Sequence, residues 1–93
     1  MKLRLSPRAR DDLREIGTYL YARNPRAAAR VRAEIQRQLK VLVDYPQAGR
    51  RVGRGLRRSV VPRLPYLIIY RADEEGAAVL VVTIRHTARR EEA

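Results

Sequence analysis

The chain has 93 residues, no cysteine, one histidine and a formal net charge of +11. This length suits one domain, residues 1–93, and the missing cysteines exclude a disulfide framework and a cysteine metal site, while one histidine disfavours zinc. No apolar run approaches the ~20 residues of a membrane span and no signal peptide is recognisable, so we expect a soluble, cytoplasmic protein without a bound metal.

The N-terminal third predicts a strand followed by a helix. Met1 to Leu5 alternates apolar and basic residues, which is the period of a half-buried strand. Ser6-Pro7 supplies an N-cap and a first-turn proline, so a helix should begin at about Pro7, with the charge of Asp12 toward its positive end. The apolar stripe of this helix consists of Ala9, Leu13, Ile16 and Leu20.

A second helix should follow at once. Asn24-Pro25 repeats the cap-and-proline signal, so the first helix is expected to end near Arg23. The second helix is expected to end at Tyr45, because Pro46 disfavours a helical conformation in the residue before it. Its apolar face consists of Ala28, Val31, Ile35, Leu39 and Leu42. Two amphipathic helices joined so tightly should pack as an antiparallel hairpin.

The C-terminal half predicts strands. The glycine-rich segment 47–55 is interpreted as a loop, and Arg57 to Arg63 as a short basic strand that Pro62 confines to an edge, an end or a bulge. Residues 66–71 and 77–86 are β-branched and apolar enough to be central strands, joined by a turn at residues 73–76.

The order of elements is therefore β-α-α-β-β-β. We expect an α+β fold in which a helical hairpin packs on one face of the sheet and the last three strands form an antiparallel meander. Alternation along the last strand places Leu80, Val82 and Ile84 on its apolar side. By the same period His86 shares that side and Arg85 lies on the other.

Positive charge is concentrated in the second half. All but Lys2 and Lys40 of the 21 basic residues are arginine, and no acidic residue occurs between Asp44 and Asp73. This stretch contains Arg50, Arg51, Arg54, Arg57, Arg58, Arg63 and Arg71. The positive electrostatic field of such a stretch favours anionic partners, either nucleic acid or an acidic protein segment. A GC-rich genome that enriches arginine and alanine is the alternative explanation of the composition.

Several short motifs follow one another in a fixed order. They include Ser6-Pro7-Arg8-Ala9, Asp12-Leu13, Tyr19-Leu20, Asn24-Pro25-Arg26-Ala27-Ala28, Tyr45-Pro46, Gly49-Arg50, Ile69-Tyr70-Arg71 and His86. In this order and spacing the chain resembles the RelE/ParE superfamily of bacterial toxins, and its helical part is more similar to the ParE branch. The resemblance implies the toxin of a type II toxin–antitoxin system, with a role in plasmid or chromosome stabilisation. It also implies a hetero-oligomer with a small, acidic, ParD-like antitoxin, and no cofactor.

The two branches of the superfamily have different targets. RelE-like toxins cut mRNA in the ribosomal A site, whereas ParE-like toxins poison DNA gyrase. Cleavage of RNA needs a base, an acid and cations for the phosphate. Here the third-strand segment 66–69 carries no cation, and His86 is followed by Thr87 rather than an aromatic residue. The resemblance and these omissions together favour a gyrase poison with no catalytic residues.

Two alternatives stay open. One is a ribosome-dependent mRNA endoribonuclease whose site is built from Arg63, Arg71, Arg85 and His86, although His86 could equally be a local structural cap. The other is a nucleic-acid-binding module driven by charge, whose affinity would fall steeply with salt. On the favoured hypothesis, the residues expected to bind protein partners are Arg50, Arg51, Arg54, Arg57, Arg58, Arg63, Arg71 and Arg85. The antitoxin is expected on the rims of the helices or on the open sheet face.

Overall fold

A computed structural model describes residues 1–88, which form two helices and a five-stranded mixed sheet. The elements are β1 (Lys2–Leu5), α1 (Pro7–Arg23), α2 (Pro25–Asp44), β2 (Arg50–Gly53), β3 (Leu56–Val60), β4 (Tyr66–Asp73) and β5 (Ala78–His86). The strand order is β1-β5-β4-β3-β2, with β1 parallel to β5 and the other neighbours antiparallel. The α+β fold and the order predicted from the sequence are confirmed.

Both helix starts are capped as the sequence predicts. The Ser6 hydroxyl accepts a hydrogen bond from the Ala9 amide at 2.9 Å and donates one to the Val82 carbonyl at 2.6 Å. The Asn24 side chain accepts bonds from the amides of Arg26 and Ala27, both at 3.1 Å. Ser6 therefore starts α1 and also ties it to β5.

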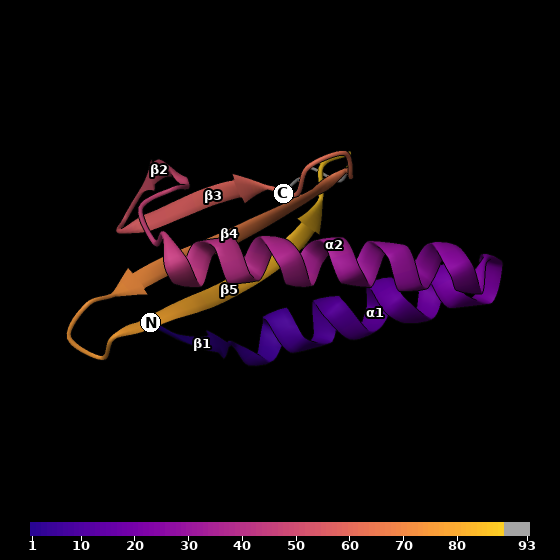
Figure 1. Cartoon of the computed structure of the whole chain (residues 1–93), viewed down its shortest axis with the longest axis horizontal. Coiled ribbons are helices and arrows are strands. Elements are labelled where there is room, and N and C mark those ends of the chain that lie inside the picture. The colour runs from indigo at the N-terminus through magenta and orange to yellow at the C-terminus, as the bar shows by residue number, and fades with distance from the viewer. Residues whose placement is uncertain (89–93) are drawn as a thin grey trace.

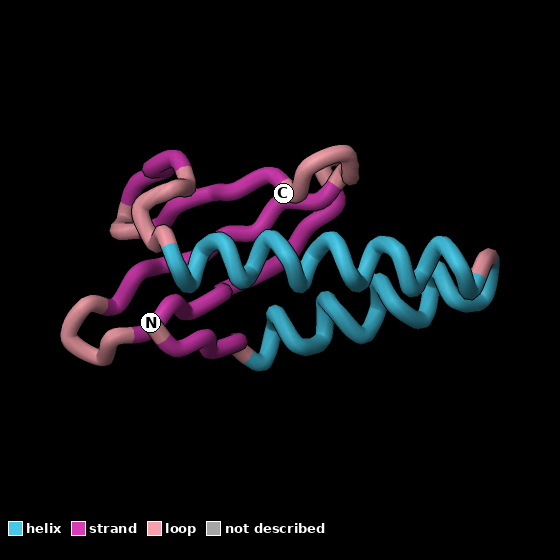
Figure 2. The backbone as a smooth tube through the Cα atoms, in the orientation of Figure 1, coloured by secondary structure: helices cyan, strands magenta, loops and turns pink. Residues whose placement is uncertain are grey.

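The helices form an antiparallel hairpin that packs against the sheet. In Figures 1 and 2, α2 crosses in front of β4 and β5, α1 runs beside it, and the tip of the hairpin extends beyond the sheet. The core lies between the two helices and the sheet. Its members include Ala9, Val31, Ile35, Leu39, Leu42, Val61, Ile68, Tyr70, Val79, Val81 and Ile84.

The segment expected to be a loop contains a short strand. β2 pairs with β3 through Arg50 opposite Arg58 and Arg51 opposite Arg57, with an irregularity before Gly53. Gly53 has a φ of 97°, so the chain turns there in a conformation that glycine favours. The basic strand also ends earlier than predicted, at Val60, because Pro62 lies in the turn that follows.

A β-bulge changes which side chains of β5 face the helices. Tyr70 pairs with Val81, but Ile69 pairs with Thr83, so Val82 is an extra residue on β5. Val79 and Val81 are therefore buried, and Ile84 returns to the same core after the bulge. The prediction that Leu80 and Val82 form the apolar side with Ile84 is wrong, since the strict period of two does not continue through the bulge.

Candidate partner interface

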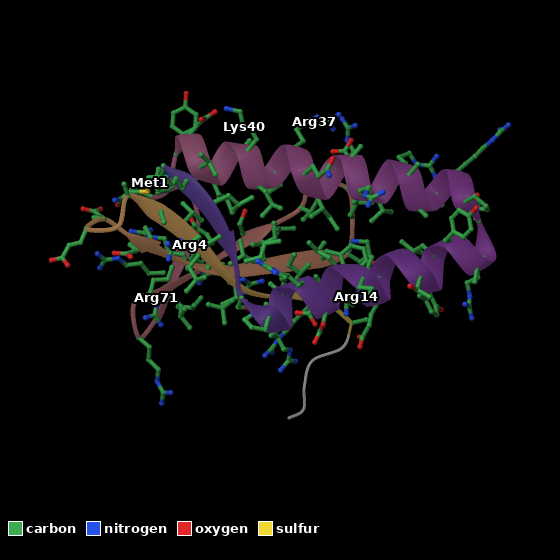
Figure 3. The ribbon with its side chains drawn as sticks, turned by 90° about the horizontal axis from the view of Figure 1, so that it is seen from below. Met1, Arg4, Arg14, Arg37, Lys40 and Arg71 are labelled. Carbon is green, nitrogen blue, oxygen red and sulfur yellow. The ribbon has the colours of Figure 1, made fainter. Side chains whose placement is uncertain are left out.

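The sheet has one face that no helix covers, which we call the open face. Side chains directly opposite each other on neighbouring strands share a face, so this surface can be followed from the pairing of Arg4 and Arg71 with Leu80. The same rule, with alternation along each strand, places on it the apolar residues Val60, Leu67, Ile69 and Leu80 and the arginines Arg4, Arg50, Arg58, Arg71 and Arg85. Figure 3 shows Arg71 on the side of the sheet away from α2, with Arg37 and Lys40 on the outer side of that helix.

The cations of the molecule differ in whether they have an acidic partner. On the helices, ion pairs join Arg8 to Asp12, Arg14 to Asp11, Arg37 to Glu34 and Lys40 to Asp44. Within residues 1–88, the side chains of Arg4, Arg50, Arg58 and Arg71 make no hydrogen bond or ion pair. Within the same residues, the side chains of Arg10, Arg26, Arg30 and Arg32 on the helices also have no such partner, so unpaired positive charge lies on the open face and on the helices alike.

Arg57 is a different kind of residue from its neighbours. It is half-buried and lies opposite Tyr70, on the core side of the sheet. Its guanidinium donates to the carbonyls of Gly49 at 2.8 Å and Gln47 at 3.3 Å, and to the Gln47 side chain at 3.2 Å. Arg57 thus holds the loop after α2 in place, and is less available to a partner than the sequence suggested.

Two hollows lie at the end of the sheet near the β4–β5 turn. One, of about 550 Å³, opens on Leu80 between Arg4 and Arg71 and is bordered by Asp73, Glu74 and Glu75 of the turn. The other, of about 500 Å³, lies along the β2–β3 hairpin, and its lining includes Arg51, Arg54 and Arg57.

The four residues nominated for RNA cleavage do not gather in one place. Arg63, Arg85 and His86 lie at the end of the sheet where β5 finishes. Arg71 is opposite Leu80, six residues back along β5, which corresponds to about 20 Å of strand. Arg85 and His86 are consecutive in a strand, so their side chains point to opposite faces.

His86 makes local contacts. Its Nδ1 accepts a hydrogen bond from the Ala88 amide at 3.0 Å, and its ring meets the Tyr66 ring edge-on with 5.3 Å between centroids. A ring whose Nδ1 is an acceptor carries its proton on Nε2. Neither contact supplies a carboxylate that would orient His86 for proton transfer, so the geometry matches a strand cap.

The two tyrosines of β4 belong to the core. Tyr70 is fully buried, and its hydroxyl accepts from the Gly49 amide and donates to the Pro46 carbonyl, both at 2.8 Å. Tyr66 is 7% exposed. Arg4 was not among the candidate residues predicted from the sequence, although the alternation in Met1 to Leu5 already placed it on one side of a strand.

Within residues 1–88 no three histidine, cysteine or acidic side chains come together to hold a metal ion. In the same part of the chain, neither helix has the length and apolar character needed to cross a bilayer.

Comparison with known proteins indicates the class of protein to which this chain belongs. The chain is 38% identical over 87 residues to Y4kP of Sinorhizobium fredii, a protein named as a toxin, covering 91% of this chain and 86% of that one. It is 36% identical over 84 residues to the toxin RelE1 of Caulobacter vibrioides, covering 88% of each. A structure of the chromosomal ParDE toxin–antitoxin system from P. aeruginosa matches with a TM-score of 0.78 and 26% identity, over 92% of this chain and 95% of that one.

The fold and these relatives define a type II toxin of the RelE/ParE superfamily. More narrowly, the model of the family described as the ParE toxin of the type II toxin–antitoxin system parDE matches residues 3–91. The chain belongs to that family.

Proposed function

We propose that this toxin inhibits DNA gyrase by binding it and stalling it on cleaved DNA, and that an acidic antitoxin neutralises it. The proposal rests on the match to the ParE family and on the likeness of the helical motifs to the ParE branch. It is a function of binding rather than of bond cleavage, and the cationic residues of the sheet and of the β2–β3 hairpin are its contact residues.

The separation of Arg71 from His86 is the observation that carries this choice of target. RNA cleavage without a metal needs proton-transfer groups and cations around a single phosphate. Here the candidate residues are divided between two ends and two faces of the sheet. A toxin that acts only by binding its target does not need these residues to lie close together.

A supercoiling assay tests the proposal directly. Purified gyrase, relaxed plasmid and ATP are incubated with increasing toxin, and the accumulation of supercoiled plasmid is followed by gel electrophoresis. We expect supercoiling to fall as toxin is added. Full supercoiling at a large excess of toxin would exclude gyrase as the target.

The ribonuclease remains the second candidate, because the relative RelE1 bears the name of the other branch. Arg63, Arg85 and His86 share one end of the sheet and are the part of that hypothesis which the geometry favours. Its signature would be cuts in translated mRNA at the ribosomal A site, detectable by primer extension.

The variant His86→Gln separates the two candidates. Glutamine keeps polar atoms at the end of β5 but cannot act as an acid or base near neutral pH. On our proposal, the growth rate of cells that express His86→Gln stays within about twofold of the rate with the unchanged toxin. The described contacts of the His86 side chain are with the Ala88 amide and the Tyr66 ring, so its loss should have a small effect on the fold. Loss of arrest by a folded His86→Gln protein, together with loss of A-site cuts, would assign the toxin to the ribosome.

A further inference from the structure

The β2–β3 hairpin, residues 50–60, carries positive charge without negative charge. It contains five arginines and no acidic residue, and the arginines are Arg50, Arg51, Arg54, Arg57 and Arg58. On the helices, the basic residues are interspersed with five acidic ones, which are Asp11, Asp12, Glu15, Glu34 and Asp44. Net positive charge is therefore concentrated on the hairpin.

The arginines of the hairpin point in three directions. Arg50 and Arg58 lie opposite each other on the open face. Arg51 lies opposite Arg57, and so on the face of the sheet that carries the core, while Arg54 lies in the turn between the strands. Within residues 1–88, Arg50, Arg51, Arg54 and Arg58 make no side-chain hydrogen bond or ion pair. The hairpin therefore presents unpaired cations on both of its faces and at its tip.

Arg54 has a backbone conformation that arginine rarely adopts. Its φ is 56°, and Gly55 follows with a φ of 74°, which is the pattern of a type I′ two-residue turn. Glycine, asparagine and aspartate are the residues favoured there, so arginine costs conformational free energy. No hydrogen bond or ion pair of the Arg54 side chain within residues 1–88 offsets this cost. Strain of this kind is concentrated at functional sites.

The base of the hairpin is fixed to the rest of the molecule. The Arg57 guanidinium donates to the Gly49 carbonyl, and the Gly49 amide donates to the buried Tyr70 hydroxyl, both at 2.8 Å. Within the described residues no strand lies beyond β2, so the hairpin forms a free edge of the sheet (Figure 1). A preformed ribbon loses little conformational entropy when it binds a partner.

We propose that the β2–β3 hairpin binds B-form duplex DNA, entering the major groove with its turn foremost. That groove is about 12 Å wide and admits a two-stranded β-ribbon. With the turn foremost, the two faces of the ribbon point toward the two phosphate walls of the groove. Arg50 and Arg51 lie on opposite faces, so each can bond phosphates of a different strand, while Arg54 enters deepest. This inference goes beyond the proposed function, because it gives the toxin a contact with DNA in addition to its contact with gyrase.

Duplex DNA suits the hairpin better than other anionic partners. Proteins that bind single strands stack bases on aromatic side chains, and residues 50–60 contain none. Double-stranded RNA has a deep, narrow major groove that side chains cannot read. An acidic protein segment would need large apolar or aromatic anchors, and the exposed apolar side chains of the hairpin are those of Val52 and Val60.

The hollow beside the hairpin allows a test of sign. Its lining includes Arg51, Arg54 and one carboxylate, that of Glu74 in the β4–β5 turn. Glu74 accepts a hydrogen bond from the Gln47 side chain at 3.2 Å and would repel a phosphate bound at the arginines. Glu74→Gln can keep the bond to Gln47 but loses the charge, so we expect it to bind DNA roughly twofold more tightly.

The test measures the affinity of the whole chain for a fluorescein-labelled DNA duplex about two helical turns long, by fluorescence anisotropy at several salt concentrations. The variant Arg51→Gln/Arg54→Asn removes two unpaired charges from the hairpin. Because asparagine suits the turn better than arginine, this variant should melt no lower than the unchanged protein. Its matched control, Arg10→Gln/Arg32→Gln, removes two exposed, unpaired charges from the helices.

We expect the hairpin variant to bind the duplex roughly tenfold more weakly at physiological salt. The slope of log affinity against log salt should become shallower by about 1.8, since each phosphate contact contributes about 0.9. The helix variant has the same net charge, but it is expected to keep the original slope and an affinity within about twofold of the unchanged protein. An RNA duplex and a single-stranded DNA of the same sequence should both bind more weakly.

Four results would overturn the inference. They are absence of duplex binding at physiological salt, equal losses in the two double variants, equal or tighter binding of the RNA duplex or the single strand, and weaker binding by Glu74→Gln. The supercoiling assay keeps the two proposals apart. Gyrase inhibition by a toxin whose hairpin variant binds DNA normally refutes the hairpin contact alone, whereas DNA binding through the hairpin without gyrase inhibition refutes the target alone.

Discussion

Replacing Gly49 by alanine is expected to destabilise the protein by roughly 3 kcal/mol, through overpacking and the loss of a buried hydrogen bond. A Cβ at this position would lie 2.5 Å from the Tyr70 hydroxyl oxygen and 2.8 Å from the Arg58 carbonyl oxygen. Gly49 also donates its amide to that hydroxyl. The added methyl group therefore requires Tyr70, a fully buried side chain, or the β3 backbone to move.

Gly17→Ala is the matched control. Gly17 lies within α1, and a Cβ there would meet no atom within 4 Å. Alanine should stabilise α1 by about 0.5–1 kcal/mol, because glycine is a poor helix former. Urea unfolding of the two variants measures both effects. If Gly49→Ala unfolds at the same urea concentration as the unchanged protein, the close packing of the loop on Tyr70 is wrong.

Removing the carboxylate of Asp12 is expected to cost about 2–3 kcal/mol, which is the range for buried groups that lose a charged acceptor. Asp12 Oδ2 accepts bonds from the Thr83 hydroxyl at 2.6 Å and from the Ile84 amide at 2.9 Å. These groups lie at the bulge of β5, where the regular ladder is interrupted. In Asp12→Ala, two buried donors lose their partner, and α1 keeps only the Ser6 bond to Val82 among its described polar side-chain ties to β5.

The neighbouring Asp11 provides the control for that loss. Its side chain is 61% exposed and, within residues 1–88, forms an ion pair with Arg14 alone, at 2.8 Å on the helix surface. Asp11→Ala removes the same charge and is expected to change the free energy of unfolding by no more than about 0.5 kcal/mol. Thermal and urea unfolding of both variants gives the comparison. Equal effects would mean that the Asp12 contacts contribute nothing beyond charge.

The helices were predictable because their signals are local. Ser6-Pro7 and Asn24-Pro25 carry the start of each helix, and Pro46 carries the end of the second. These residues cap or stop the helix through contacts with backbone groups only a few residues away in the sequence. No knowledge of the rest of the fold is needed to interpret them.

The strands show where local signals stop. The bulge at Val82 reverses the faces of β5, and nothing in a run of valines announces an extra residue. β2 is a four-residue edge strand of two arginines, one valine and one glycine, all of them exposed, so a single apolar residue gives no alternation to detect. Both features depend on strands that are far away in the sequence.

The composition of the candidate interface can be seen in the sequence, but its arrangement cannot. The excess of arginine between Asp44 and Asp73 is visible in the sequence. The division of Arg57 and Arg58 between opposite faces needs the register with β4, and the contribution of Arg4 needs β1 beside β5. The sequence predicted that the negative charge of Asp12 interacts with the positive end of the helix dipole. In the structure Asp12 also accepts hydrogen bonds from β5, which are tertiary contacts that no local pattern predicts.

Trapping of the gyrase–DNA cleavage complex tests the central proposal most directly. Gyrase, supercoiled plasmid and toxin are incubated, and denaturant and protease are then added to release any broken DNA. We predict that linear plasmid accumulates in proportion to the toxin and that His86→Gln produces the same amount. Intact circular plasmid at a large excess of folded toxin would contradict the account.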